Sequence, residues 1–438
     1  MYTYIIYPLY IMNSMSKYTN SGLNIYSDLN RPFFVFNHTY YTILQYRIKK
    51  VMKKLIILQQ YSNIYTEFIR VSRVKKLDTS ANTYIDFNLE HSIFIQLLLV
   101  KFKVKLKFLK FCLISLLDDV PNKLDDRYIE SLDFVNVIKV VPITRKFDFI
   151  PQEHFLLFKK YLNIITHETA LKISGTRFSM FHGFLAELHR ALGQFMLNIH
   201  IQKNKYVEVS VPFLVKGRSL YNTGQLPKFT EELYKIQKED LWLIPTGEVP
   251  LVNIVSGLVL LEDDLPLKFV SKTACFRREV GKYGKDLKGI FRQHQFEKVE
   301  LVQVVTPKLS DYYLQCMLGD VTSILDYLEL PYRVILLNKD DIGFTSSITY
   351  DVEVWLPGKG AYIEVSSCSN TTDFQSRRMG TKYKNKLTGK TEFVHTLNGS
   401  GLALGRVLIG IMENYQDKKG SIAVPKVLQP YMSLEQNI

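Results

Sequence analysis

The sequence has few of the residues that build metal centres and disulfide frameworks. Its four cysteines lie far apart, and neither they nor the nine histidines show the close spacing of a zinc site. The most apolar stretch, Ile93 to Val100, is too short to cross a bilayer and runs into alternating lysines. The sequence therefore predicts a protein without structural metal, disulfides or membrane span, and a reducing compartment suits it. The cysteines are Cys112, Cys275, Cys316 and Cys368.

Acidic residues are scarce in the N-terminal part of the chain. Residues 1–117 hold 16 Lys and Arg against 5 Asp and Glu, which is +11 of the formal net charge of +14. Such a basic region suggests RNA or a membrane surface as a partner, although an AT-rich genome would also enrich the chain in lysine. The first 27 residues contain no acid, as in organelle-targeting leaders, but only one base, Lys17. We interpret residues 1–38 as an irregular leader or targeting segment.

The next eighty residues carry two apolar patterns. The first predicts a coiled-coil seam, because its members recur at intervals of three and four. It comprises Leu44, Ile48, Val51, Leu55 and Leu58. A polar stretch at 78–83 predicts a turn, and a second, imperfect seam follows at Ile93, Leu97, Val100, Val104 and Phe111. Residues 100–108 also alternate with lysine, which is a strand pattern, so periodicity alone leaves helix and strand open.

Two charged runs contain the clearest candidates for chemistry. Residues 276–279 read Phe-Arg-Arg-Glu, residues 291–300 read Phe-Arg-Gln-His-Gln-Phe-Glu-Lys-Val-Glu, and the loop between them holds three glycines. Two such runs around a glycine-containing loop predict a hairpin. Arginine suits a phosphate because its planar fork donates in pairs and stays charged. Glutamate can accept from an amine, and phenylalanine offers a flat face to a purine.

These residues resemble motif 2 of the class II aminoacyl-tRNA synthetases, and the run from Phe276 to Glu300 is most similar to the seryl-tRNA synthetases. The resemblance extends from about Asp118 to Met432. It implies an α+β fold, with a class II catalytic domain built on an antiparallel β-sheet flanked by helices. It also implies an N-terminal antiparallel coiled-coil arm, and therefore helix at 100–108. We expect a basic helical tRNA-binding arm over residues 39–120 and the catalytic domain over residues 121–438. An ordinary helical hairpin packed on the body is the alternative for the arm.

Two further family motifs flank motif 2, which spans about 273–300. Residues 186–200 have a helical pattern and residues 206–212 alternate as a strand, and together they resemble motif 1, at about 186–212. Motif 1 forms the dimer interface in the family, although a packed helix and an edge strand would look the same. Residues 396–416 resemble motif 3, a strand of small residues continued by a helix. Residues 350–357 alternate like a half-buried strand.

The resemblance assigns roles to individual residues. Arg277 and Arg406 would be the catalytic arginines, at the α- and γ-phosphates of ATP. L-serine would contact Thr246, Gly247 (where the family usually has Ala), Glu248, Arg277, Glu300, Asn398 and Ser400. ATP would contact Arg277, Arg278, Glu279, Gln293, His294, Gln295, Phe296, Glu364, Val365, Ser366, Ser367 and Arg406. Glu364 and Ser367 would hold Mg²⁺, which prefers oxygen ligands.

The resemblance implies that the chain activates L-serine with ATP and transfers it to the 3′ end of serine tRNA, as a homodimer that is not membrane-bound. Two alternatives are an amino-acid ligase that charges a carrier protein and a non-catalytic RNA-binding paralogue. The retained motif residues argue against the paralogue, and the basic N-terminal region argues against the carrier ligase. The wording of motif 3 is closer to the bacterial type, which together with the acid-poor N-terminus suggests a plastid or mitochondrion, with the cytoplasm as the alternative.

Overall fold

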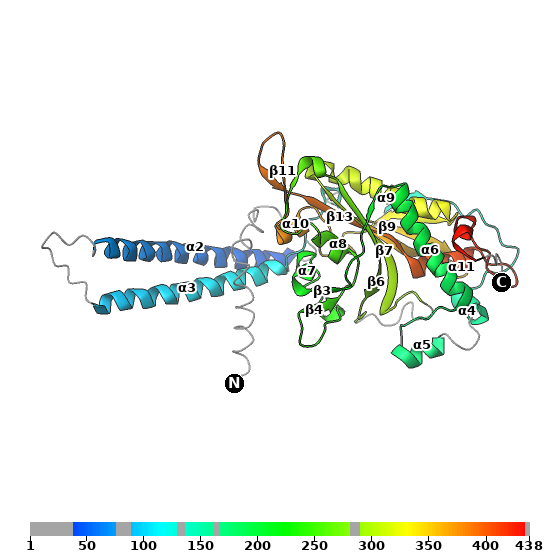
Figure 1. Cartoon of the computed structure of the whole chain (residues 1–438), viewed down its shortest axis with the longest axis horizontal. Coiled ribbons are helices and arrows are strands. Elements are labelled where there is room, and N and C mark those ends of the chain that lie inside the picture. The colour runs from blue at the N-terminus through cyan, green and yellow to red at the C-terminus, as the bar shows by residue number, and fades with distance from the viewer. Residues whose placement is uncertain (1–37, 76–88, 129–135, 162–166, 281–289, 434–438) are drawn as a thin grey trace. The chain divides into compact units, whose positions relative to one another are not determined.

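The computed structural model describes residues 38–75, 89–128, 136–161, 167–280 and 290–433 (Figure 1). These residues form two compact units, one ending at Pro121 and the other beginning at Asn122. The first unit is a pair of helices, α2 (His38–Lys75) and α3 (Leu89–Asp118). Within the described ranges, no helix is long and apolar enough to cross a membrane.

The first unit is the expected antiparallel helix pair, and the strand alternative for residues 100–108 is wrong (Figure 1). The first predicted seam agrees with α2, in which Leu55 is buried and Val51 and Leu58 are half-buried. Tyr61 of α2 stacks on Phe102 of α3, with 6.3 Å between the ring centroids. The two helices therefore pack along one apolar seam, as the spacing of three and four residues predicts.

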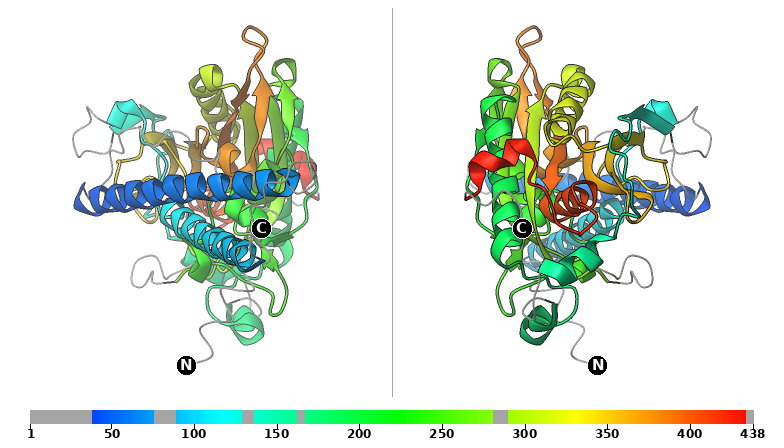
Figure 2. Two further views of the ribbon diagram at one scale, coloured as in Figure 1. Left: turned by 90° about the vertical axis from the view of Figure 1, so that its left-hand side faces the viewer. Right: turned by 90° about the vertical axis from the view of Figure 1, so that its right-hand side faces the viewer.

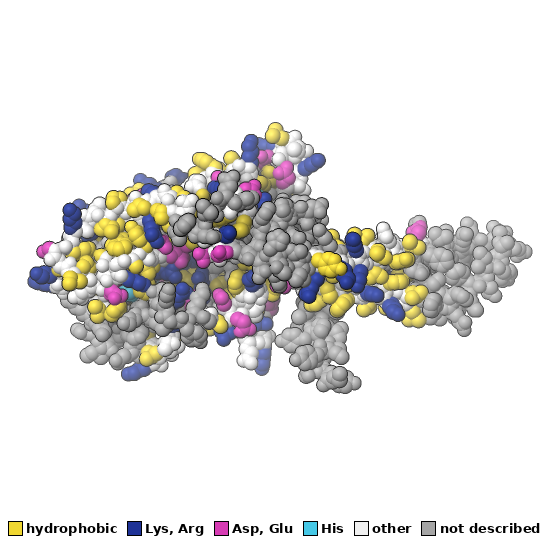
Figure 3. Space-filling model, turned by 180° about the vertical axis from the view of Figure 1, so that it is seen from behind, with side chains coloured by type: hydrophobic (Ala, Val, Ile, Leu, Met, Phe, Trp, Pro, Cys, Tyr) yellow, Lys and Arg dark blue, Asp and Glu magenta, His cyan; other side chains and the backbone are white. Residues whose placement is uncertain are grey.

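The second predicted seam has the wrong phase. Leu97, Val100 and Val104 are 62%, 59% and 60% exposed. The buried apolar positions among the described side chains of α3 are instead Leu99, Leu106, Leu113 and Leu117. Apolar residues occupy more than one face of α3, so several phases fit its sequence, and packing against α2 selects one. Figure 3 shows the consequence, with hydrophobic and basic side chains interleaved on the outside of the pair. The predicted turn at 78–83 lies outside the described residues.

The second unit is built on an eight-stranded sheet in the order β1-β8-β9-β10-β13-β7-β6-β2. Every pair in it is antiparallel except β2 with β6. The strands are β1 (Asn136–Val140), β2 (Val207–Glu208), β6 (Leu267–Phe276), β7 (Gln295–Val305), β8 (Tyr332–Leu336), β9 (Ile348–Leu356), β10 (Ala361–Asn370) and β13 (His395–Ala403). The antiparallel sheet expected of the catalytic domain is confirmed.

Three helices pack on one face of this sheet: α6 (Gly183–Gln202), α9 (Ser310–Tyr327) and α11 (Leu404–Asn414) (Figure 2). Strand β7 shows how the alternation of side chains separates the two faces. Val299, Leu301 and Val305 belong to the core beneath these helices, whereas Val302 and Val304 pack on the opposite face. Lys298 and Glu300 share the parity of Val302, so they belong to the face away from the three helices.

Shorter elements complete the unit. The helices are α4 (His154–Tyr161), α5 (His167–Ser174), α7 (Gly217–Asn222), α8 (Glu248–Asn253) and α10 (Phe374–Met379), with 3-10 turns at Asp126–Tyr128, Thr230–Glu232, Glu262–Asp264, Pro307–Leu309 and Lys426–Tyr431. The strands are β3 (Leu214–Lys216), β4 (Leu241–Leu243), β5 (Val259–Leu261), β11 (Lys382–Lys384) and β12 (Thr391–Phe393). Helix α8 packs on β6 and β7 from the face opposite α6.

The predicted elements of the three motifs are present, with three differences. The motif 1 strand is only β2, because it is an edge strand that pairs with β6 through Val207 and Glu208. The second charged strand begins at Gln295 rather than at Phe291. Strand β9 is buried on both faces rather than half-buried, since it lies between β8 and β10 under a helix.

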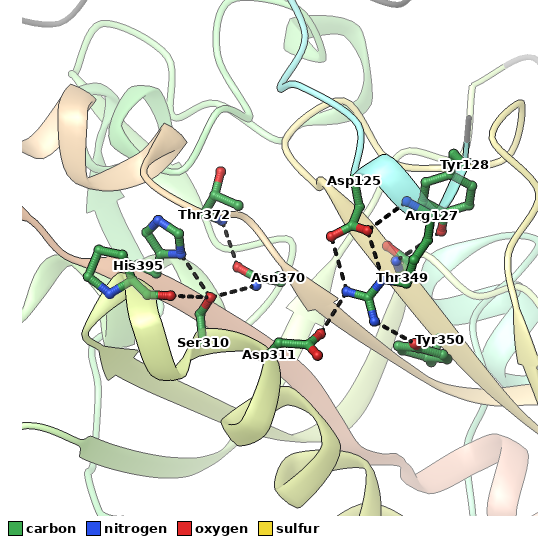
Figure 4. A network of polar contacts seen from close by, with 11 residues as sticks. Asp125, Arg127, Tyr128, Ser310, Asp311, Thr349, Tyr350, Asn370, Thr372 and His395 are labelled. Carbon is green, nitrogen blue, oxygen red and sulfur yellow. Dashed lines mark hydrogen bonds and ion pairs between the residues drawn. The ribbon is translucent and has the colours of Figure 1, made fainter. Parts of the chain in front are cut away.

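A polar network anchors the start of the second unit (Figure 4). Arg127 donates to Asp125 at 2.7 Å, to Asp311 at 2.6 Å and to the hydroxyl of Tyr350 at 3.3 Å. These bonds join the turn at Asp126–Tyr128 to α9 and to β9. They hold the segment that follows the helix pair in the sequence against the eight-stranded sheet.

Candidate active site

A buried polar cluster lies where α8 meets β7. The hydroxyl of Thr246 donates to Glu300 and accepts from the ammonium of Lys298 at 2.9 Å. Lys298 Nζ also lies 2.5 Å from Glu300 Oε2, and the two side chains are 8% and 1% exposed. Glu248, the first residue of α8, adds a second buried carboxylate. The cluster thus contains two carboxyl groups and one ammonium.

The carboxyl group of Glu248 is held by amide side chains. Gln375 donates to Glu248 Oε1 at 2.6 Å, and Asn398 also bonds to this carboxyl group. Burial, and then the charge of Glu300, raise the pKa of Glu248 to about 7. The Oδ1 atom of Asn398 is buried and has no hydrogen-bond partner among the described residues. The Asn398 oxygen and the Glu248 carboxyl group therefore lie together, and both can accept a hydrogen bond from a ligand.

The pKa of Glu248 predicts how the affinity for a cationic ligand depends on pH. A ligand ammonium needs the ionised carboxylate, so its affinity should rise with pH until Glu248 is fully ionised. Between pH 6 and pH 8 we expect the dissociation constant of serine, the ligand that the family resemblance implies, to fall about tenfold and then to level off. The measurement is equilibrium dialysis with labelled serine across this range. In Glu248→Gln the profile should be flat, and an equally steep profile in that variant would contradict the assignment to Glu248.

Gly247 lies between Thr246 and Glu248, where a methyl group would be crowded. An added Cβ would lie 3.0 Å from the Cβ of Glu300 and 3.2 Å from the hydroxyl of Thr273. The φ angle of Gly247 is −63°, so its backbone conformation does not require glycine. Glycine at this position lets α8 pack closer to β7 than a residue with a side chain would.

The two predicted catalytic arginines lie at the same end of the sheet. Arg277 directly follows β6, and Arg406 follows β13 by three residues. Both strands are antiparallel to β7, so they run in the same direction and end at the same edge. The cross-strand row Thr273–Lys298–Ala403 connects the two ends through β7.

Arg277 is fixed at the base of the motif 2 hairpin. Its Nε donates to the Pro245 carbonyl at 3.1 Å, one residue before Thr246. Its guanidinium carbon lies 5.2 Å from the centroid of the Phe296 ring. His294 is bonded to Arg277 twice, through its backbone carbonyl at 2.9 Å and its Nδ1 at 3.0 Å. Arg277 is thus held between the buried cluster and the aromatic ring.

A β-bulge brings the predicted magnesium ligands onto one face. Glu364 and Ser367 are three residues apart, so in a regular strand their side chains would point to opposite faces. The register between β10 and β9 shifts between Glu364 and Ser366, after which Ser367 pairs with Asp351. Arg406 reaches the same place, because its Nη1 lies 2.8 Å from the Glu364 carbonyl and 3.2 Å from Glu364 Oε2.

Several residues predicted to contact ATP have other partners or positions. Glu279 pairs with Arg292 at 3.3 Å and has a positive φ of 48°. Gln293 is buried and donates to Ser179. Arg278 and Gln295 are exposed.

The bulge that aligns Glu364 and Ser367 turns the two residues between them into the core. Val365 is buried in the core beneath the three helices, and Ser366 is buried and bonded to the Ser400 carbonyl at 2.6 Å. The side chains of these two residues therefore face the core, so the predicted contact with ATP would be made by their backbone.

Three site residues were missed by sequence reasoning: Lys298, Gln375 and Asp351. Lys298 stands two positions before Glu300 in a predicted strand, so the period of two places both side chains on one face. Gln375 and Asp351 carry no such signal. Burial, and then the charge of Glu364, raise the pKa of Asp351 to about 7, and its Oδ1 has no hydrogen-bond partner among the described residues.

Residues 229–415 match the tRNA synthetase class II core domain (G, H, P, S and T), which defines the class of protein. A serine–tRNA ligase of Thermotoga sp. (strain RQ2) is 54% identical over 291 residues, which are 66% of this chain and 68% of that protein. One of Marinobacter nauticus is 50% identical over 317 residues, or 72% and 73% of the two chains. The solved seryl-tRNA synthetase of Pyrococcus horikoshii, complexed with ATP, superposes with a TM-score of 0.77 at 28% identity and covers 90% of this chain and 91% of that one. The chain belongs to the seryl-tRNA synthetase family.

Proposed function

We propose that the buried cluster at Glu248 and Glu300 binds L-serine and that the arginines at the sheet edge hold ATP beside it. The activity of the chain is the aminoacylation of tRNA with serine, and neither a carrier-protein ligase nor a non-catalytic paralogue is favoured. One observation carries the assignment of the site. Two buried carboxyl groups face one buried ammonium, which leaves one negative charge for the ammonium group of an amino acid.

The roles within the serine pocket follow from these contacts. Glu248 and the buried Oδ1 of Asn398 accept from the substrate ammonium. Ser400 and Glu300, cross-strand partners on β13 and β7, hold the substrate hydroxyl. Arg277 binds the substrate carboxylate from the neighbouring end of β6. Gly247 and Thr246 form the floor where α8 approaches β7.

Activation then requires little covalent chemistry from the protein. The serine carboxylate attacks the α-phosphorus of ATP in line, a new oxygen–phosphorus bond forms, and pyrophosphate leaves. Arg277 neutralises charge that develops on the α-phosphate, Arg406 binds the leaving pyrophosphate, and the ring of Phe296 stacks on adenine. The acyl group next passes to the 3′-hydroxyl of tRNA, and AMP leaves.

The residues at the β10 bulge fit a magnesium ion. Glu364, Ser367 and Asp351 present only oxygen atoms on one face. The Oδ1 of Asp351, which none of the described residues satisfies, is a buried acceptor that a hydrated cation would satisfy. We propose that Glu364 and Ser367 hold the ion, as the family resemblance implies. When bound, the ion would neutralise charge on the ATP phosphates.

The function is tested by ATP–pyrophosphate exchange with each of the twenty amino acids. We expect serine alone to support rapid exchange. Alanine would leave the partners of the substrate hydroxyl unpaired, so its kcat/KM should be lower by about 10⁴-fold, and threonine should be refused sterically. Equal activation of alanine and serine would contradict the pocket, and exchange with another amino acid only would overturn the proposed function.

The helix pair is the proposed tRNA-binding arm. Its exposed lysines at 101, 103, 105 and 107 supply the positive charge that an RNA backbone attracts. Removal of residues 1–117 should abolish tRNA charging while serine-dependent exchange continues. In the whole chain tRNA affinity should fall steeply as salt rises. Charging by the truncated chain at the full rate would show that the helix pair is not needed for tRNA.

Dimerisation and an organellar location also belong to this proposal. The resemblance to motif 1 in α6 and β2 supports a homodimer, which sedimentation analysis would detect. The acid-poor N-terminus and the bacterial wording of motif 3 support a plastid or mitochondrion over the cytoplasm. Imaging of a fluorescent fusion of the whole chain tests the location.

A further inference from the structure

We propose that His200, a buried residue of α6 on the face of the sheet opposite the serine pocket, is a positioning residue that fixes Ser400 in that pocket. The inference rests on the serine pocket proposed above. His200 touches no predicted substrate group, and it acts through the backbone of motif 3. The carrying observation is a β-bulge in β13 that this histidine holds in place.

The bulge lies at Gly401. Ser400 pairs with Glu300 and Leu402 pairs with Val299, so two neighbouring residues of β7 face three residues of β13. Leu402 belongs to the core beneath the helices, whereas Ser400 lies in the row of Glu300. The extra residue therefore decides which side chains of motif 3 face the substrate.

His200 is bonded to this extra residue. Its Nε2 lies 3.1 Å from the carbonyl oxygen of Gly401, and because a carbonyl only accepts, Nε2 carries the proton. Nδ1 is then the acceptor for the side-chain amide of Asn204, at 3.1 Å. A neutral ring satisfies both partners, and burial lowers the pKa of His200 to about 4, so the ring stays neutral at physiological pH.

Steric fit makes the contact specific. A Cβ added at Gly401 would lie 2.8 Å from Nε2 of His200 and 3.0 Å from Cγ of Leu301. The imidazole therefore occupies the space that any side chain at the bulge would need. On the other side of the bulge, the hydroxyl of Ser366 donates to the Ser400 carbonyl at 2.6 Å. The two consecutive peptide groups around Gly401 are thus held from α6 and from β10.

Loss of the imidazole would release one of these two bonds and leave a buried carbonyl without its donor. The bulge could then relax, and the side chain of Ser400 would move relative to Glu300. The effect should fall on serine and not on ATP, because the proposed ATP residues do not belong to the bulge: Arg277 follows β6, Phe296 lies near the start of β7, Glu364 lies on β10 and Arg406 lies on α11. Glutamine can donate from its amide nitrogen to Gly401, whereas asparagine is too short to reach it.

The test compares His200→Leu, His200→Asn and His200→Gln with Met196→Ala in serine-dependent ATP–pyrophosphate exchange. Met196 is buried one turn earlier on α6, so its truncation loosens the same core and leaves the hydrogen bonds of the bulge in place. We expect His200→Leu and His200→Asn to raise KM for serine about tenfold, to leave KM for ATP within about twofold, and to weaken discrimination against alanine and threonine. His200→Gln should restore most of the parent values, and Met196→Ala should lower the thermal midpoint alone.

The inference would be overturned if His200→Asn and His200→Gln behaved alike, or if His200→Leu shifted the thermal midpoint as Met196→Ala does with unchanged serine KM and selectivity. If His200→Leu does not fold, the comparison of asparagine with glutamine still decides. Failure of the parent chain to activate serine would contradict the proposed function, whereas similar serine parameters in all folded variants would contradict only the role of His200.

Discussion

Replacing Arg277 by alanine should lower serine-dependent ATP–pyrophosphate exchange by about a hundredfold or more. The guanidinium of Arg277 would donate to the α-phosphate and to the substrate carboxylate, where negative charge develops. Loss of one such preorganised donor typically costs about 3 kcal/mol of transition-state stabilisation. The hydrogen bond to the Pro245 carbonyl and the contact with the Phe296 ring hold the Arg277 guanidinium in position before the reaction. Because the donor is positioned in this way, we expect no other side chain to replace it in Arg277→Ala.

The control for this variant is Arg277→Lys, which keeps the charge but lacks the planar fork. We expect it to retain more exchange than alanine and less than the parent, because an ammonium cannot make the paired contacts of a guanidinium. Thermal unfolding of each variant confirms that it is folded. Near-normal exchange by a folded Arg277→Ala variant would remove Arg277 from the reaction.

Replacing Lys298 by methionine should cause the second large effect, on both stability and serine binding. The ammonium is the buried positive partner of Glu300, and it also donates to Thr246. Removing one member of a buried ion pair leaves an uncompensated charge and typically costs about 3–5 kcal/mol. The measurements are the unfolding free energy in denaturant, which we expect to fall, and the dissociation constant of serine, which we expect to rise.

Two further variants make this prediction specific. Lys272→Met removes the ion pair of Lys272 with Glu297 on the same pair of strands, which is partly exposed, so it should cost no more than about 1 kcal/mol. In the double variant Lys298→Met/Glu300→Gln the uncompensated charge of Glu300 is gone, so stability should partly return while serine activation stays lost. A stability loss in Lys298→Met no larger than in Lys272→Met would contradict a buried pair.

The sequence could predict the hairpin of motif 2 and the strand-to-helix passage of motif 3, because both depend on local patterns. The alternation of side chains along a strand also places Lys298 beside Glu300. Thr246, Glu248 and Glu300 come together as expected, and Asn398 joins them through its bond to Glu248.

The missing parts have physical causes. The positions of the bulges at Val365 and Gly401 cannot be predicted from the sequence, because a bulge depends on pairing with a neighbouring strand. They decide that Val365 and Ser366 face the core and that Glu364 and Ser367 share one face. Glu279 pairs with Arg292, which is 13 positions further along the hairpin, and this pairing depends on how the hairpin folds. The phase of α3 was also set by its partner helix and not by its own pattern.

The central claim is that one site, at the edge of the sheet where β6 and β13 end and β7 begins, binds ATP and serine together. A crystal structure of the chain with ATP and serine, or with a non-hydrolysable seryl-adenylate analogue, tests it most directly. We predict that Arg277 and Arg406 contact phosphates of one nucleotide and that the amino group of serine lies against Glu248. A nucleotide that contacts only one of the two arginines, or serine bound away from Glu248 and Glu300, would contradict the claim.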